Sequence, residues 1–153
     1  RVAERKALTV AQTAGAGGHV LAADTVVVLG RRVLGKPGSA AEAEEMLRSL
    51  SGRWHTVVTG VALCGGGRCE SLAVATRVHF RPLTEAEVRW YVATGETMDK
   101  AGAYALQGAA AAFVDRIRGS HSNVIGLPVA ETLELLARAG YAPWSLGKAT
   151  DGR

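Results

Sequence analysis

The chain has 153 residues, of which 48% are hydrophobic and 21% charged, and its formal net charge is +4. This composition supplies enough apolar material for one core and excludes disordered and collagen-like chains. No apolar run approaches the roughly 20 residues that span a bilayer, and the opening RVAERKALTV lacks the long apolar stretch of a signal peptide. We therefore expect a cytoplasmic protein that does not contact a membrane.

The positive charge could indicate a nucleic-acid partner, so the distribution of basic residues matters. They are scattered, and no basic stretch is interleaved with aromatic residues, which make up only 5% of the chain. Proteins that contact a phosphate backbone usually gather Lys and Arg along one face or stripe. The sequence therefore predicts no nucleic-acid partner and leaves a homodimer open.

The first half of the chain alternates helical and extended patterns. Residues 2–14 have the composition of a helix, which Gly15 to Gly18 would end. The apolar run from Val20 to Leu29 predicts a strand, and a turn with two arginines leads into a short VLG segment. Ser39 and Glu42 have the spacing of a capping box, which predicts a helix from there to Leu50.

The second half predicts a hairpin and further helices. Val- and Thr-rich runs on both sides of a glycine turn indicate two antiparallel strands, and Thr84 with Glu87 forms a second capping box. The further expected elements are the hairpin strands Trp54 to Cys64 and Ser71 to Phe80, a helix to about Ala93, a loop from Asp99 to Gly108, a strand from Ala110 to Ile117, and a helix from Pro128 to Ala139 with Leu133, Leu135 and Leu136 toward the core. This order predicts one α/β domain over residues 1–140 and a C-terminal tail over residues 141–153.

Asp24 is the only acid in the apolar run from Leu21 to Leu29, and Lys36 follows the next turn. A buried carboxylate costs several kcal/mol unless it is paired or binds a metal. The pattern therefore indicates a cation or a polar site beside Asp24, with Lys36 as a candidate member. The alternative is that Asp24 ends a strand-edge turn and Lys36 is solvated.

The remaining polar residues give weaker signals. Cys64 and Cys69 flank the glycine turn, and we expect two reduced thiols there, because a structural zinc site needs about four ligands. The glycine runs at residues 15–18 and 65–67 match neither the P-loop nor the GxGxxG pattern and are expected to be turns. His55 and His79 lie in strand-like runs and are expected to be structural. His121 lies in GSHSN, which is expected to be a turn, and is given no catalytic role.

Five ordered blocks of the sequence resemble the Maf family of nucleoside triphosphate pyrophosphatases. They occur in the family's order and spacing, and the resemblance covers roughly Ala3 to Gly140. The blocks are ADTVV, LGKP, LSGRWHTVVTGVAL from Leu50, YVATGETMDKAGAYALQG from Tyr91, and GSHSNVIGLPVAETLELL from Gly119. The resemblance implies an α/β fold with a mixed β-sheet, flanking helices and a central cleft, as in Maf and ITPase proteins.

The resemblance also implies an activity and a set of site residues. Family members cleave a nucleoside triphosphate between the α and β phosphates with a divalent metal, Mg²⁺ or Mn²⁺, and Asp24 matches the carboxylate that would bind the metal and orient water. Lys36 and Lys6 match lysines that would offset phosphate charge, since an ammonium is a compact point charge. Thr25 and Gln107 are candidate substrate-binding residues. Lys100 is a second-rank candidate, because it could instead form a surface ion pair with Asp99.

ADTVV and DKAGAYALQG resemble the subgroup that acts on dTTP and UTP, so a pyrimidine substrate is preferred over 7-methyl-GTP. Family members also carry an S-x-S-P-R-R segment that binds phosphate, and this sequence has no counterpart of it before Val2. We therefore expect a fragment or a truncated form with weak activity. The alternative function is a non-catalytic, nucleotide-binding regulatory protein linked to septum formation. A third alternative is a basic RNA-associated module, which the scattered charge disfavours.

Overall fold

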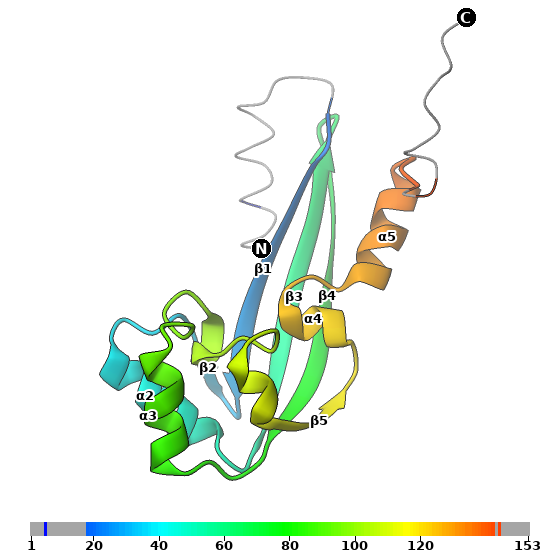
Figure 1. The fold of residues 1–153 in the computed structure, drawn as a ribbon. Helices are drawn as coiled ribbons and strands as arrows, with labels where there is room; N and C mark the ends of the chain where they lie inside the picture. The colour runs from blue at the N-terminus through cyan, green and yellow to red at the C-terminus, as the bar shows by residue number, and fades with distance from the viewer. Residues whose placement is uncertain (1–4, 6–17, 143, 145–153) are drawn as a thin grey trace, which may run out of the picture.

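The computed structural model describes residues 5, 18–142 and 144, and these form one twisted sheet with helices packed against it (Figure 1). The strand order is β2-β1-β3-β4-β5, and all four pairings are antiparallel. The strands are β1 (Val20–Leu29), β2 (Arg32–Leu34), β3 (Trp54–Gly65), β4 (Arg68–Phe80) and β5 (Val114–Arg118). The predicted α/β class with flanking helices is confirmed.

The helices of the described residues are α2 (Ala40–Leu50), α3 (Glu85–Ala93), α4 (His121–Ile125) and α5 (Val129–Arg138), with short 3₁₀ turns η1 (Ala101–Ala103) and η2 (Ala109–Ala112). The helix predicted for residues 2–14 lies outside the described residues except for Arg5, which is helical, and so does most of the predicted C-terminal tail. No helix in the described part is long and apolar enough to cross a bilayer.

Alternation along β3 separates the two faces of the sheet. Successive side chains of a strand point to opposite faces, and residues 55, 57, 59, 61 and 63 of β3 are buried. Val57 belongs to the main core with side chains of α2 and α3, whereas Val61 and Leu63 pack with Leu135 of α5. The described helices therefore cover the face of the sheet that carries the odd-numbered residues of β3.

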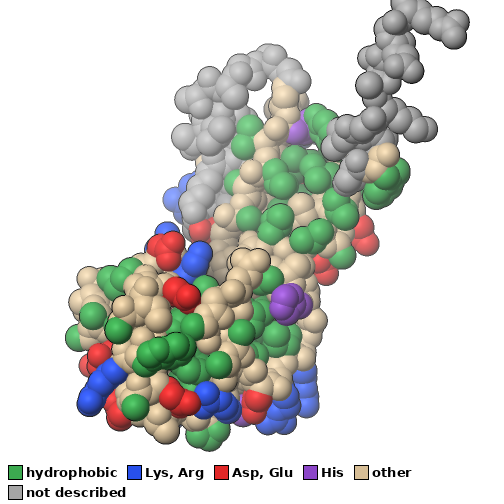
Figure 2. Space-filling model, in the orientation of Figure 1, with side chains coloured by type: hydrophobic (Ala, Val, Ile, Leu, Met, Phe, Trp, Pro, Cys, Tyr) green, Lys and Arg blue, Asp and Glu red, His purple; other side chains and the backbone are tan. Residues whose placement is uncertain are grey.

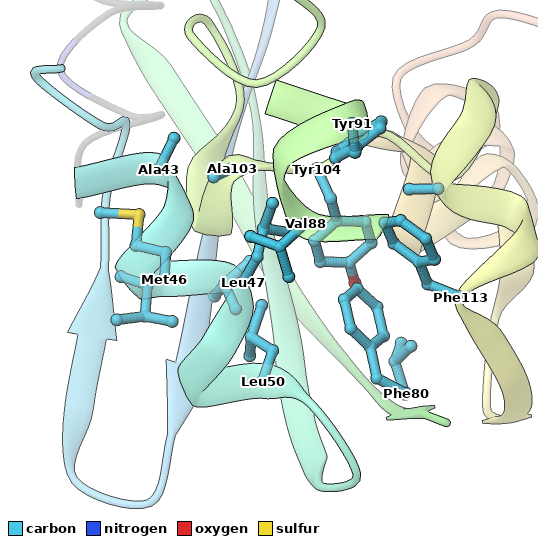
Figure 3. Packing of buried hydrophobic residues seen from close by; sticks show 14 of the residues in the cluster. Ala43, Met46, Leu47, Leu50, Phe80, Val88, Tyr91, Ala103, Tyr104 and Phe113 are labelled. Carbon is cyan, nitrogen blue, oxygen red and sulfur yellow. The ribbon is translucent and has the colours of Figure 1, made fainter. Parts of the chain in front are cut away.

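The main core lies at the end of the sheet that α2 and α3 cover. Its largest fully buried side chains include Tyr91, Phe80 and Phe113. Figure 3 shows these rings next to Leu47, Leu50 and Val88, with Tyr104 between the helices and the sheet. The ring centroids of Phe80 and Tyr104 lie 4.8 Å apart in an edge-on arrangement, which is a favourable geometry for aromatic pairs.

Both helix starts for which the sequence predicted a capping box are present. Thr84 accepts from the Glu87 amide while the Glu87 carboxylate accepts from the Thr84 amide, which is a complete capping box for α3. At α2, Ser39 accepts from the Glu42 amide, but the Glu42 carboxylate accepts from Gly38 N–H at 2.8 Å. The Glu42 carboxylate therefore accepts from the residue before the N-cap and not from the N-cap amide itself, as it would in a complete capping box.

Two local predictions were wrong in part. The alanine run before Phe113 forms η2, so β5 begins at Val114 and not at residue 110. Residues of the expected GSHSN turn form the short helix α4, because the Ser120 hydroxyl accepts from the Asn123 amide at its start.

The prediction of two reduced thiols was also wrong. Cys64 and Cys69 are directly paired across the β3–β4 hairpin, with Cα atoms 4.1 Å apart, and they form a disulfide. Residues directly opposite on antiparallel strands bring their side chains together, so the short glycine turn placed the two sulfur atoms within bonding reach. The sequence interpretation assumed a reducing compartment and did not use this register.

Candidate active site

A cavity of about 520 Å³ lies beside β1, near the point where its pairing with β2 begins. Four segments line it: residues 23–27 of β1, Gly35 and Lys36 after β2, residues 99–101 and 104–107 around η1, and residues 124–126 at the end of α4, with Val57 of β3 also in the wall. β2 pairs only with residues 27–29 of β1. Within the described residues, the first part of β1 therefore has no strand on that side, and the cavity opens along this edge.

Five of the six site residues predicted from the sequence line this cavity. They are Asp24, Thr25, Lys36, Lys100 and Gln107, which come from three separate segments. Lys6 lies outside the described residues. The shared cavity is a structural finding, and the roles assigned to these side chains stay predictions.

Asp24 and Thr25 reach the cavity from adjacent positions on β1. Their partners on β3 are Gly60 and Thr59. Gly60 has no side chain, so nothing on β3 crowds the carboxylate from the directly opposite position. Since successive residues of a strand point to opposite faces, the cavity at this open edge is in contact with both faces of β1.

A chain of hydrogen bonds orients the Thr25 hydroxyl. The Thr25 and Thr59 hydroxyl oxygens lie 2.9 Å apart, and the Thr59 hydroxyl donates to the Asn123 carbonyl at 3.2 Å. Because Thr59 has a single hydroxyl proton, Thr25 is the donor in the first of these bonds. The Thr25 oxygen therefore retains acceptor capacity on the cavity side.

Asn123 holds this chain of hydrogen bonds against the sheet. Its side-chain amide donates to the carbonyls of Val57 at 3.1 Å and Val74 at 3.0 Å, and the residue is fully buried. Buried polar groups with several partners rigidify their surroundings. The short helix α4 is thereby fixed beside Thr25, and its last residues form a wall of the cavity.

The loop that carries Lys36 is attached to the wall that carries Lys100. The Gly102 amide donates to the Gly35 carbonyl at 3.1 Å. Gly102 has φ +70, and a Cβ there would lie 2.9 Å from Val27 Cγ2. Only glycine fits this backbone conformation at such close approach, so Gly102 sets the distance between η1 and β1.

Two tyrosines stabilise this wall, and one of them, Tyr104, belongs to the cavity lining. The Tyr91 hydroxyl accepts from the Ala105 amide at 2.9 Å, and burial raises the pKa of Tyr91 to about 12. The Tyr104 hydroxyl lies 2.8 Å from His55 Nε2. Burial lowers the pKa of His55 to about 4, and the nearby charge of His79 adds to this effect. His55 is therefore neutral near pH 7 and structural, as its position in a strand predicted.

Asp99 is a cavity residue that the sequence interpretation did not include in the site. It was considered only as an ion-pair partner of Lys100, and the two side chains are 3.9 Å apart, with most of the Asp99 side chain exposed. The sequence did contain one signal that Asp99 belongs to the site. Asp99 lies three residues before Gly102, which has a positive φ, in the segment that returns to β1. The cavity thus has two carboxylates, Asp24 and Asp99, in its lining.

A divalent metal fits this donor set. Mg²⁺ is commonly bound by one or two carboxylates together with substrate phosphates and water, and it does not require a cage of protein ligands. The described residues contain no group of three or more His, Cys, Asp or Glu side chains that could hold a metal by themselves. Two carboxylates beside two lysines match a site that a metal and a polyphosphate would fill together.

The sequence matches one protein family over most of its length. The profile of the family described as "Maf-like protein" matches residues 1–139. A protein of Anaeromyxobacter dehalogenans strain 2CP-C, named dTTP/UTP pyrophosphatase, is 54% identical over 149 residues, which cover 94% of this chain and 74% of the relative. Proteins of the same name from Myxococcus xanthus and Symbiobacterium thermophilum are 54% and 50% identical, covering 94% and 92% of this chain and 73% and 72% of the relatives.

Proposed function

The chain belongs to the Maf family, and on this basis we propose that it hydrolyses dTTP and UTP to the nucleoside monophosphate and pyrophosphate. The observation that carries the proposal is the cavity, in which Asp24 of β1 lies in the same lining as Lys36, Lys100 and Gln107. Relatives that are 54% identical are named for this activity. A cytoplasmic location is part of the same proposal.

In this proposal the lysines bind and orient the triphosphate. Lys36 and Lys100 lie on walls joined by the Gly102–Gly35 hydrogen bond, so their ammonium groups approach the substrate from a fixed frame. Positive groups aimed at the leaving pyrophosphate stabilise the charge that develops there. Lys6 is proposed as a third such group from its match to the family.

Asp24 is proposed as the group that orients the attacking water and accepts its proton. The water oxygen attacks the α phosphorus, the bond to the α–β bridging oxygen breaks, and pyrophosphate leaves with that oxygen. A divalent metal held by Asp24 and Asp99 would supply Lewis-acid neutralisation of the phosphate oxygens. Asp24 is thereby assigned both metal binding and the positioning of water.

Thr25 and Gln107 are proposed to select the pyrimidine base. Uracil and thymine present an N3–H donor between two carbonyl acceptors, whereas cytosine has an acceptor at N3. The Thr25 oxygen retains acceptor capacity, and the Gln107 amide offers both a donor and an acceptor. A site built to pair with N3–H leaves its polar groups unpaired against cytosine, which disfavours CTP.

A pyrophosphate-release panel tests this function. The protein is assayed with dTTP, UTP, dCTP, CTP, dATP, GTP and 7-methyl-GTP in Mg²⁺ and in Mn²⁺. We expect release from dTTP and UTP in both metals, and at least about tenfold lower kcat/KM for the cytosine nucleotides. Preference for 7-methyl-GTP would contradict the substrate assignment, and binding of dTTP without release from any nucleotide would favour the regulatory function.

A further inference from the structure

Three arginine side chains surround one tryptophan on the sheet face opposite to the described helices. The Cζ atoms of Arg77, Arg116 and Arg118 lie 4.8, 5.2 and 5.0 Å from the centre of the Trp54 ring. The His79 ring lies 5.1 Å from the same ring. We call these five residues the Trp54–arginine patch.

Strand register explains why residues far apart in the sequence meet here. Trp54 is paired with His79, His79 with Arg116, and Arg77 with Arg118. Their neighbours in the strands, Val78 and Ile117, face the main core. The patch is therefore built from β3, β4 and β5 on the face away from α2 and α3, and Figure 2 shows Lys and Arg side chains gathered at the lower right, where β5 lies in Figure 1.

The three guanidinium groups form no ion pair among the described residues, although the charge of Arg116 contributes to lowering the pKa of the nearby Asp115. None of them takes part in a hydrogen bond or an ion pair there, whereas Arg48 and Arg81 are each paired with a glutamate. The nearest acid of the patch, Asp115, is occupied by His79 at 2.6 Å. The patch thus carries a local excess of positive charge and many free N–H donors.

Gathering three like charges is unfavourable unless something offsets their repulsion. Each contact of a guanidinium with the indole contributes about 0.5–1 kcal/mol at an exposed site. These contacts with the indole also restrict the arginine side chains, so less side-chain entropy is lost when they bind a ligand. A polyanion would remove the remaining repulsion, and planar guanidinium forks match phosphate oxygens in pairs.

The surroundings of the patch favour an extended ligand. Next to it on the same face, β3 and β4 carry no charged or aromatic side chain at Val58, Gly60, Ala73 and Ala75, so no long side chain projects from this stretch. The patch has no helix or projecting ribbon that could enter the groove of a duplex. A single strand can lie along an open sheet face, contacting arginines with its phosphates and stacking its bases on planar groups.

We propose that the Trp54–arginine patch binds the backbone of single-stranded nucleic acid. This site is separate from the cavity, because none of its five residues lines the cavity. It does not depend on the proposed pyrophosphatase activity. The sequence prediction of no nucleic-acid partner rested on the lack of a basic stretch, and this patch forms only when the strands pair.

Fluorescence anisotropy of labelled 12-nucleotide dT and rU strands tests the proposal. The variant carries Arg77→Gln, Arg116→Gln and Arg118→Gln. The matched control carries Arg31→Gln, Arg32→Gln and Arg138→Gln, which removes the same charge elsewhere. We expect the patch variant to lose at least about tenfold in affinity. The slope of log K against log salt should become less negative by about 2, because each phosphate contact on a single strand contributes about 0.7 to it.

Two further readouts locate the binding. Oligonucleotide should change the tryptophan fluorescence of the protein, and Trp54→Phe should remove this change while Trp90→Phe does not. Pyrophosphate release and the melting temperature of the patch variant should equal those of the control. Equal affinity and salt slope for the patch and control variants would overturn the proposal. Polyglutamate that binds as tightly as dT and with the same dependence on the three arginines would overturn it in favour of an acidic protein.

Discussion

The hydroxyl oxygens of Thr25 and Thr59 lie 2.9 Å apart, and the Thr59 hydroxyl donates its hydrogen bond to the Asn123 carbonyl. This relationship fixes which way the Thr25 hydroxyl proton points, although Thr59 is buried and does not line the cavity. In the role proposed for Thr25, a residue outside the cavity lining thereby determines whether Thr25 presents an acceptor or a donor to the base.

Thr59→Val therefore should change substrate binding more than the chemical step. Without Thr59, the Thr25 hydroxyl is free to rotate, so it no longer presents a fixed acceptor to the base. We expect KM for UTP to rise several-fold with kcat nearly unchanged, and the discrimination against CTP to narrow. The change also removes one of the hydrogen bonds to the Asn123 carbonyl, which keeps the one from the Gly126 amide, so the cost in folding stability is about 0.5–1.5 kcal/mol. Steady-state kinetics with both nucleotides, beside a melting curve, separate the effects. A lower melting temperature with unchanged KM and selectivity would contradict the orienting role.

The lysines should matter more than the neighbouring arginines. Lys36→Ala and Lys6→Ala are expected to lower kcat/KM for dTTP by at least about tenfold, because each would remove a charge that the proposed mechanism assigns to the leaving phosphates. Arg31→Ala and Arg32→Ala serve as matched controls. Arg31 lies in the turn before β2, Arg32 is the first residue of β2, and both are exposed. Small and equal losses at all four positions would show that the lysines belong only to a solvated basic surface.

Sequence patterns predicted the elements whose cause is local. The apolar run of β1 and the capping box at Thr84 each depend on residues within a few positions of one another, and both are present. The candidate residues of the cavity were found because each belongs to a short motif with its own chemistry, and five of them line one cavity.

The features that the sequence did not predict depend on register. The disulfide required Cys64 and Cys69 to be directly opposite across a turn, and the Trp54–arginine patch required alignment of three strands. Residues Ala109–Ala112 are all alanine, so the sequence has no polar or β-branched residue there that would distinguish a short 3₁₀ turn from a strand. Asp99 was missed because a surface ion pair with the adjacent Lys100 was sufficient to explain it.

Acid should destabilise the fold through His55. Its ordinary pKa of 6.5 applies in the unfolded chain, whereas burial lowers the folded value to about 4. The unfolded state therefore binds the proton first, and the stability from neutral His55 is complete above pH 6.5 and is lost as the pH falls toward 4. The limiting slope for one group is about 1.4 kcal/mol per pH unit.

Urea unfolding at several pH values between 7 and 4.5 measures this slope. His55→Phe keeps a ring against Phe80 and Tyr104 but cannot titrate, so its stability should fall less steeply over the same range. The Tyr104 hydroxyl loses its partner in this variant, which lowers stability at every pH and leaves the slope comparison intact. Parallel curves for the two proteins would assign the acid sensitivity to other groups.

Reducing the hairpin disulfide should lower stability without changing catalysis. The bond closes a short loop, for which the chain-entropy estimate is about 2 kcal/mol, and neither cysteine lines the cavity. We expect the melting temperature of Cys64→Ser/Cys69→Ser to fall by about 4–8 °C, with kcat/KM for dTTP unchanged. Thiol titration of the unfolded protein checks the bond itself, and two reactive thiols before reduction would contradict it.

The central claim is that Asp24 directs water to the α phosphorus of dTTP and UTP, and oxygen-18 labelling tests it most directly. UTP is turned over in H₂¹⁸O with Mg²⁺, and ³¹P spectra record which product carries the label. We predict labelled UMP and unlabelled pyrophosphate, with Asp24→Asn at least about a hundredfold slower and Asp115→Asn, a carboxylate outside the cavity, at the native rate. Label in pyrophosphate, formation of UDP and phosphate, or a native rate for Asp24→Asn would contradict the account.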